Sequence, residues 1–244
     1  MFCPLKRSAP MGRSSLFGGR LLRRAAYALT FLTAGCGAEG LVLRAGEDVK
    51  ALRLSAERGE VSVIGGAAVD SPTLRWEVRG LSSSAQVLST ERDGVWEVQL
   101  DCAGGLGCEV VAVVELPPGF DVDVSVHAGE LSLRGRFGVV DASFGQGEVV
   151  GRLAARRVSM ALGRGDVDLG LSEPPEALTV TLGLGDLNLS LPSQGYDLDL
   201  DLPADRALVE GVLIDPAGPR LRALTASGSV RIRGTARDTS TAAR

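Results

Sequence analysis

The sequence predicts an all-β domain, a right- or left-handed β-helix or solenoid-like stack of short strands with a less regular N-terminal part that contains hairpins. Three observations favour this fold class. The 244 residues include 32 glycines but only 4% aromatic residues, so the core must consist of aliphatic side chains between frequent turns. Apolar and polar residues alternate over most of the chain, and a short glycine-containing unit recurs about every twenty residues.

Residues 1–35 are predicted to be a lipoprotein signal peptide that is removed. A basic flank precedes an apolar run from Ala25 to Ala34, which is too short to span a bilayer as a permanent helix. The ending Leu32-Thr33-Ala34-Gly35-Cys36 resembles a bacterial lipobox, in which the cysteine is diacylated and becomes the new N-terminus. The alternative is an ordinary signal peptide cut near Ala34. Translation from either Met1 or Met11 fits the pattern.

The resemblance implies an envelope protein held to a membrane by a lipid on Cys36. Gly37 stands where aspartate is associated with inner-membrane retention, which favours the outer membrane, with a periplasmic or surface-facing domain. Residues 1–35 hold six of the 26 basic residues and none of the 30 acidic ones, so their removal changes the formal charge from −4 to −10. A domain this acidic argues against nucleic acid as a partner.

After a tether at 36–50, strands are expected at 52–65, 73–80, 94–102, 108–119 and 120–129. Val110–Leu116 is almost continuously apolar, which predicts a strand covered on both faces. Trp76 and Trp96 lie in neighbouring strands and are expected in the core.

Two cysteines, Cys102 and Cys108, remain in the domain predicted to fold outside the cell. Five residues separate them, three of them glycine, and an exported protein can form disulfides. We expect a local disulfide that closes a hairpin. A metal or redox pair is the alternative, but zinc needs further ligands and a dithiol catalyst usually has two residues between its cysteines.

The second half repeats a unit of glycine, an acidic residue, an aliphatic residue, any residue and an aliphatic residue. Copies or degenerate copies begin at Gly59, Gly129, Gly147, Gly165, Gly185 and Gly228, and the spacing from Gly129 to Gly185 is 18, 18 and 20 residues. Such a period predicts coils stacked at strand spacing, and a sandwich or curled antiparallel sheet is the runner-up. The repeat loosens after Leu191, the copy at Gly228 is expected to close the domain 51–234, and 235–244 is predicted to be a disordered tail.

The motifs together resemble the bacterial β-solenoid domains of unknown function that carry the label "putative adhesin". The early unit is Gly59–Val63, the aliphatic strand with its Pro-Pro-Gly turn is Val110–Gly119, and the later glycine-acidic copies follow. The resemblance covers roughly 40–234 and implies the fold and a role in adhesion, with no catalytic residues.

Metal binding has one candidate, the acidic residues that follow the repeat glycines. In register, Glu130, Glu148, Asp166 and Asp186 would form a ladder with neighbours about 4.8 Å apart, which could recruit calcium. The competing interpretation has these carboxylates splayed into solvent or bonded to turn N–H groups. No other cofactor is expected.

Catalysis is not predicted. The chain has no lysine after Lys50, and its single histidine, His127, is expected to face solvent or to lie at a corner. Arg220, Arg222, Arg231 and Arg233 fit outward strand positions as well as they would flank an acid pair. We therefore expect a non-enzymatic, monomeric protein that presents a repetitive β face to a protein or glycan. An envelope sensor or regulatory partner, and less favourably a polysaccharide-acting β-helix enzyme, are the alternatives.

Overall fold

The computed structural model describes residues 30–34, 41–80, 84–103, 107–202 and 204–235. These residues form one open sheet of 15 strands, and the only helical element among them is a short 3-10 turn at Ala204–Arg206. The all-β prediction is confirmed. Among the described residues, no helix is long and apolar enough to cross a membrane.

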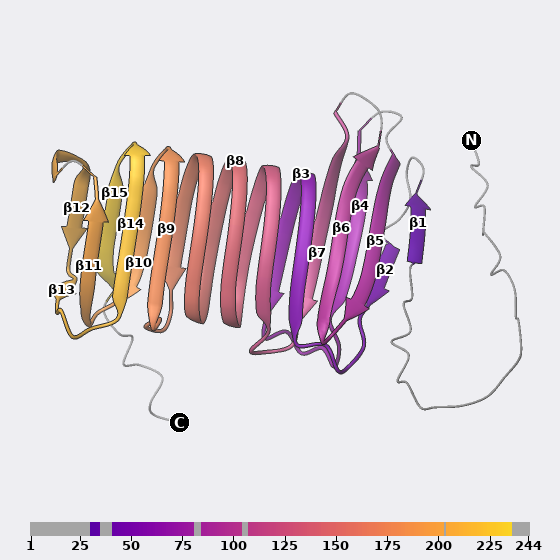
Figure 1. Ribbon diagram of the computed structural model, residues 1–244, viewed down its shortest axis with the longest axis horizontal. Helices are drawn as coiled ribbons and strands as arrows, with labels where there is room; N and C mark the ends of the chain where they lie inside the picture. Colours follow the sequence, from indigo (N-terminus) through magenta and orange to yellow (C-terminus); the bar gives the residue numbers. More distant parts are fainter. Residues whose placement is uncertain (1–29, 35–40, 81–83, 104–106, 203, 236–244) are drawn as a thin grey trace, which may run out of the picture.

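The sheet bends over itself, so that its strands lie in a front layer and a fainter back layer in Figure 1. Two long strands, β3 (Ala51–Gly65) and β8 (Asp121–Leu171), pass through both layers. The front layer also contains β1 (Thr30–Ala34), β5 (Ser84–Arg92), β6 (Val95–Ala103), β9 (Ala177–Leu184), β14 (Arg220–Ser227), β11 (Gly195–Asp201) and β13 (Leu213–Ile214). The back layer contains β2 (Leu41–Arg44), β4 (Thr73–Arg79), β7 (Glu109–Leu116), β10 (Leu187–Pro192), β15 (Val230–Thr235) and β12 (Ala207–Glu210).

The repeat glycines mark the corner where the chain passes from the front layer to the back layer. We call each front arm, corner and back arm a rung. Residues 51–65 pair in parallel with 121–135, and 157–164 pair in parallel with 177–184. A Cβ atom on Gly129 would lie 1.9 Å from the Gly59 carbonyl oxygen, so the corners stack directly on one another. The period read from the sequence is therefore the length of one rung.

The core lies between the two layers, because alternate side chains of both point inwards. Along β7, and along β9 as far as Leu182, every second residue is buried, as the alternation predicts for strands with one covered face. Trp96 and Trp76 are 0% and 2% exposed and belong to this core, as expected. Val110–Leu116 differs from the prediction: its outward residues are only partly buried, because just one face of β7 packs on the core.

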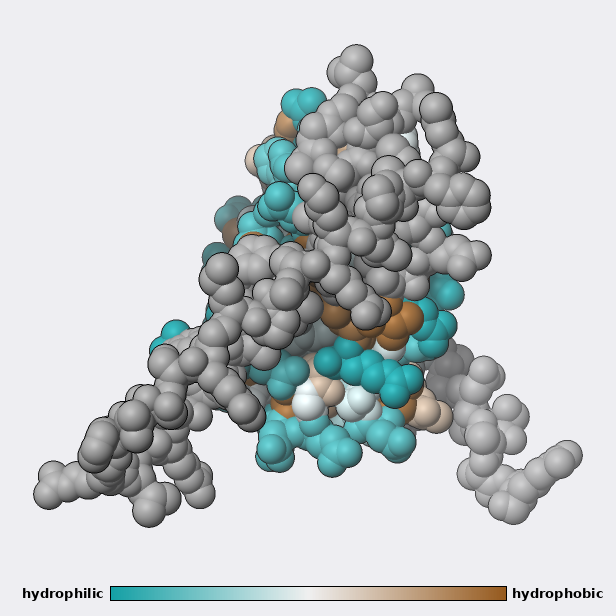
Figure 2. All heavy atoms as spheres, turned by 90° about the vertical axis from the view of Figure 1, so that its right-hand side faces the viewer, coloured by the Kyte–Doolittle hydropathy of each residue, from teal (hydrophilic) through white to brown (hydrophobic). Residues whose placement is uncertain are grey.

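The N-terminal part contains the antiparallel pairs. β5 and β6 form a hairpin whose turn contains Asp93 and Gly94, both with positive φ. β2 pairs antiparallel with β4, so part of the segment predicted to be a tether belongs to the sheet. In the end-on view of Figure 2, the visible described side chains are hydrophilic around the lower rim and hydrophobic further in.

The expected hairpin around Cys102 and Cys108 is wrong. β6 and β7 are not paired with each other, because each pairs in parallel with a different half of β3. They are the front and back arms of one rung, and the Cys102–Cys108 disulfide joins them where the other rungs have a glycine corner.

The copy at Gly228 does not close the domain as expected. β14 lies between β9 and β11, and β15 lies between β10 and β12. The C-terminal rung is thus inserted between two rungs that are consecutive in sequence, and residues 195–214 form the end of the sheet (Figure 1). Arg220 and Arg222 reach Asp199 on β11, which ties the inserted rung to the last one.

Candidate functional site

The outward face of the front layer carries rows of short side chains that run across the strands. Ser55 lies in register with Gln99 on one side and Ser125 on the other. The Ser143 hydroxyl donates to that of Ser125 over 3.0 Å, and the row continues through the paired residues Ala161 and Thr181. The strand register therefore places residues that are far apart in sequence side by side in one row.

A second row beside the first runs from Glu57 and His127 into three glycines. Gly145, Gly163 and Gly183 lie on successive rungs, and a Cβ on Gly163 would approach the Gly145 carbonyl oxygen to 2.5 Å. The missing side chains leave an open groove of about 730 Å³ that crosses the front layer. Its lining is mainly small or polar, and includes Ser55, Gln99, Ser125, Ser143, Thr181 and the three glycines.

The titratable groups on this groove are His127, Glu57 and Asp101. His127 is exposed, as predicted, and its ring lies over Gly145. An imidazole and two carboxylates beside hydroxyl groups can donate and accept hydrogen bonds to a ligand laid along the groove. Among the residues that the structure describes, no hydrogen bond joins His127 to a serine, the contact that an activated nucleophile requires.

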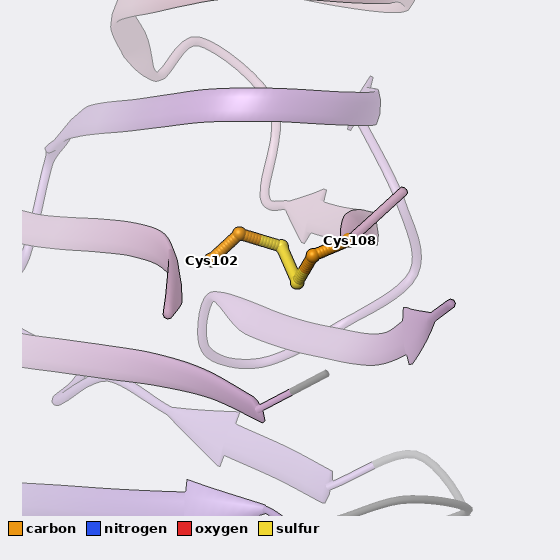
Figure 3. Close-up of a disulfide and its surroundings, with 2 residues drawn as sticks. All are labelled: Cys102 and Cys108. Atoms are coloured by element: carbon orange, nitrogen blue, oxygen red, sulfur yellow. A yellow bond between two sulfur atoms is a disulfide. The ribbon is translucent and has the colours of Figure 1, made fainter. Parts of the chain in front are cut away.

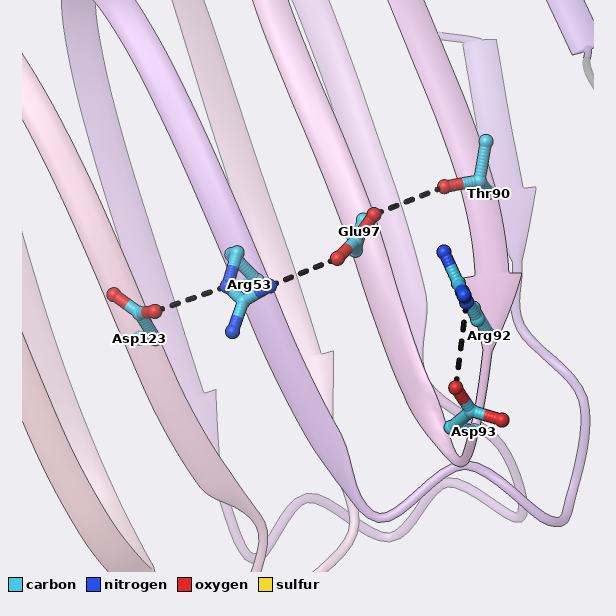
Figure 4. Close-up of polar contacts among 6 residues, drawn as sticks. All are labelled: Arg53, Thr90, Arg92, Asp93, Glu97 and Asp123. Atoms are coloured by element: carbon cyan, nitrogen blue, oxygen red, sulfur yellow. Dashed lines mark hydrogen bonds and ion pairs between the residues drawn. The ribbon is translucent and has the colours of Figure 1, made fainter.

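Charged residues form a ladder along one side of the groove (Figure 4). Arg53 donates to Glu97 over 2.9 Å and to Asp123 over 3.1 Å, and Thr90 donates to Glu97 over 3.4 Å. The hydrogen bond to Asp123, with the charge of that carboxylate, raises the pKa of Arg53. Because the charges alternate in sign, neighbouring strands attract one another, although water screens these exposed pairs and each contributes little to stability.

Two of the acidic corners, Asp166 and Asp186, accept hydrogen bonds from backbone N–H groups, as the competing interpretation proposed. The backbone N–H of Asp186 donates to Asp166 over 2.9 Å, and Ser229 donates to Asp186 from both its N–H and its hydroxyl over 2.8 Å. These bonds from Ser229 lower the pKa of Asp186. Glu130 and Glu148 occupy the equivalent corners of earlier rungs. Within the described part of the chain, no three His, Cys, Asp or Glu residues are grouped as a metal site.

Cys102 and Cys108 are joined by a disulfide, with their Cα atoms 5.9 Å apart (Figure 3). It closes the passage from the front layer to the back layer at the end of β6, beside Asp101 on the groove. Cys36, the predicted lipidation site, lies outside the described residues, as do residues 1–29 and 236–244.

The groove was not anticipated from the sequence, although a signal was present. Ser125, Ser143, Ala161 and Thr181 are separated by 18, 18 and 20 residues, the same spacing as the corner glycines. Because these outward residues have the same spacing as the corner glycines, the spacing indicates that they lie in one row.

In architecture the chain is similar to solved bacterial structures whose names describe adhesion. One is a putative cell adhesion protein from Clostridium sporogenes, with 10% sequence identity, a TM-score of 0.41, and coverage of 81% of this chain and 99% of that one. Another is a putative adhesin from Parabacteroides merdae, with 9% identity, a TM-score of 0.28, and coverage of 84% and 95%. No protein-family model and no curated protein matches the chain.

These neighbours carry the same label as the family that the sequence motifs resemble. Similarity of this degree transfers no ligand or activity to this chain.

Proposed function

We propose that this chain is an exported, lipid-anchored, non-enzymatic protein of the bacterial cell envelope that presents its front layer for adhesion to a protein or glycan. The domain is a solenoid-like stack of rungs, attached through Cys36, with the outer membrane as the favoured location. The groove on the front layer carries the proposal, because it brings hydroxyl groups from several rungs into one row, with only Ala161 between Ser143 and Thr181.

The chemistry of the groove suits an extended polar ligand. Hydroxyl groups such as those of Ser125, Ser143 and Thr181 can each donate one hydrogen bond and accept others. Neighbouring strands are about 4.8 Å apart, so the row offers polar contacts at short, regular intervals. The three glycines of the groove leave room for a chain of sugars or an extended peptide.

The test is binding of the full chain, purified from membranes, to arrays of glycans and of envelope or matrix proteins. Ser143→Arg and Thr181→Arg fill the groove from positions on the outward face, so the fold should tolerate them. Asn188→Arg, a half-exposed position on the back layer, is the matched control.

We expect both groove variants to weaken binding at least tenfold, about 1.4 kcal/mol, while the control binds like the wild type. Binding that survives both groove substitutions, or is weakened equally by the control, would contradict the assignment of the groove. The array also distinguishes a glycan from a protein ligand.

A further inference from the structure

The front layer ends in a strand that the proposed processing would remove. Residues Thr30–Ala34 form β1, which pairs antiparallel with β5 from Thr30 opposite Ser89 to Ala34 opposite Ala85. Figure 1 shows β1 as the outermost strand at this end. These residues precede Cys36 and lie within the predicted signal peptide, so lipoprotein processing would detach them.

Loss of β1 leaves the outer side of β5 as an open edge. β5 is nine residues long, contains neither proline nor lysine, and has charged residues only at its last two positions, Glu91 and Arg92. Val87 on this strand is only 1% exposed, and Leu88 is half-buried on the opposite face. A long, unblunted edge of this kind presents free N–H and C=O groups that readily accept another strand.

We propose that β5 of a second copy replaces β1 in the processed protein, giving a two-fold dimer with a sheet continuous across both chains. The proposal rests on the proposed export and anchoring, which remove β1. β1 shows that the edge accepts an antiparallel strand, and antiparallel pairing of a strand with its own copy generates a two-fold axis. This proposed dimer replaces the monomer that the sequence predicts.

One register suits this pairing. Centred on Leu88, it places the two Leu88 residues opposite each other, Val87 opposite Ser89 and Gln86 opposite Thr90. Glu91 and Arg92 then lie opposite Ala85 and Ser84, so no like charges face each other across the pair.

The position of the anchor also favours this dimer. β2, the first described strand after Cys36, lies at the same end of the molecule as β5. Two anchored copies would therefore meet at their membrane-proximal ends, and confinement to one membrane raises their effective concentration.

The test uses the full chain expressed in a bacterial envelope and a thiol at the two-fold axis. Leu88→Cys brings the two introduced thiols together, so mild oxidation should give a disulfide-linked dimer. Thr181→Cys, exposed in the middle of the front layer, is the control and should stay monomeric. Gln86→Cys and Thr90→Cys, placed in separately tagged copies, should crosslink to each other and so report the register without altering Leu88.

A charge swap provides an independent measurement. Leu88→Lys and Leu88→Glu each place like charges opposite each other, and we expect co-purification of two tagged copies to fall at least tenfold. Co-expression of one with the other should restore it.

The mass of the N-terminal peptide separates the two proposals. A processed chain that gives neither crosslinks nor charge rescue overturns the dimer and leaves the proposed function standing. A chain that retains residues 30–34 contradicts the anchoring and the dimer together.

Discussion

Replacement of Gly165 by alanine should destabilise the domain far more than one added methyl group suggests. Gly165 has φ +130°, and its Cβ would lie 1.7 Å from the Gly147 carbonyl oxygen. The left-handed backbone costs alanine about 1–2 kcal/mol. The rungs must also separate by roughly 1 Å, which breaks or lengthens ladder hydrogen bonds worth about 0.5–1.5 kcal/mol each. We expect a loss of about 3–5 kcal/mol in the free energy of unfolding.

Gly119→Ala is the matched control. Gly119 also has a positive φ, +81°, but no atom lies within 4 Å of its Cβ position. Gly119→Ala should lower the free energy of unfolding only by the cost of the left-handed backbone, about 1–2 kcal/mol. Urea denaturation of both variants of the full chain measures the difference. If Gly165→Ala costs no more than Gly119→Ala, the corners do not stack as described.

Three further predictions concern the disulfide, a buried tyrosine and the inserted rung. Reduction of Cys102–Cys108 should lower the free energy of unfolding by about 2–3 kcal/mol, since it frees a short loop; equal denaturation midpoints with and without reductant would refute this. Burial raises the pKa of Tyr196 to about 12, against about 10 in the unfolded chain. The neutral phenol therefore contributes about 1–3 kcal/mol to the free energy of unfolding below pH 10, and this contribution is lost as the pH rises towards 12. Tyr196→Phe should be less stable at pH 8, because the bond to the Pro192 carbonyl is lost, and should show a flatter alkaline pH profile; a profile unchanged from the wild type would count against it. Truncation after Ala217 removes β14 and β15, so hydrogen exchange at 195–214 should lose its protection while 121–171 keeps it; loss across both segments would mean that the rungs unfold as one unit.

The sequence was sufficient to predict the strands and corners of the central rungs, because both follow from local physics. Inward and outward residues alternate along β8, and glycine is needed wherever one corner passes against the next. These constraints repeat with each rung, so the period of the chain shows directly in the order of residues.

The order of rungs in space could not be read in the same way. The repeat gives sequence order, yet β15 pairs with β10, with Leu187 opposite Val230, while residues 195–214 move to the end. Only the long gap between Gly185 and Gly228 hinted at an interruption. Likewise, the spacing of Cys102 and Cys108 is compatible with a hairpin or with a corner, and pairing of both strands with β3 decides between them.

The groove depended on the same long-range register. Ser125 and Thr181 are ordinary outward residues when each strand is considered alone. They become one surface only because the rungs pair in register, so that equivalent positions align across the front layer.

Anchoring is the claim on which the proposed function and the dimer both depend, and mass spectrometry of the protein purified from membranes tests it most directly. The account predicts a mature chain that begins at Cys36 and carries a diacylglyceryl group on its sulfur. An unmodified N-terminus near Ala34, or a chain that still carries residues 1–35, would contradict it.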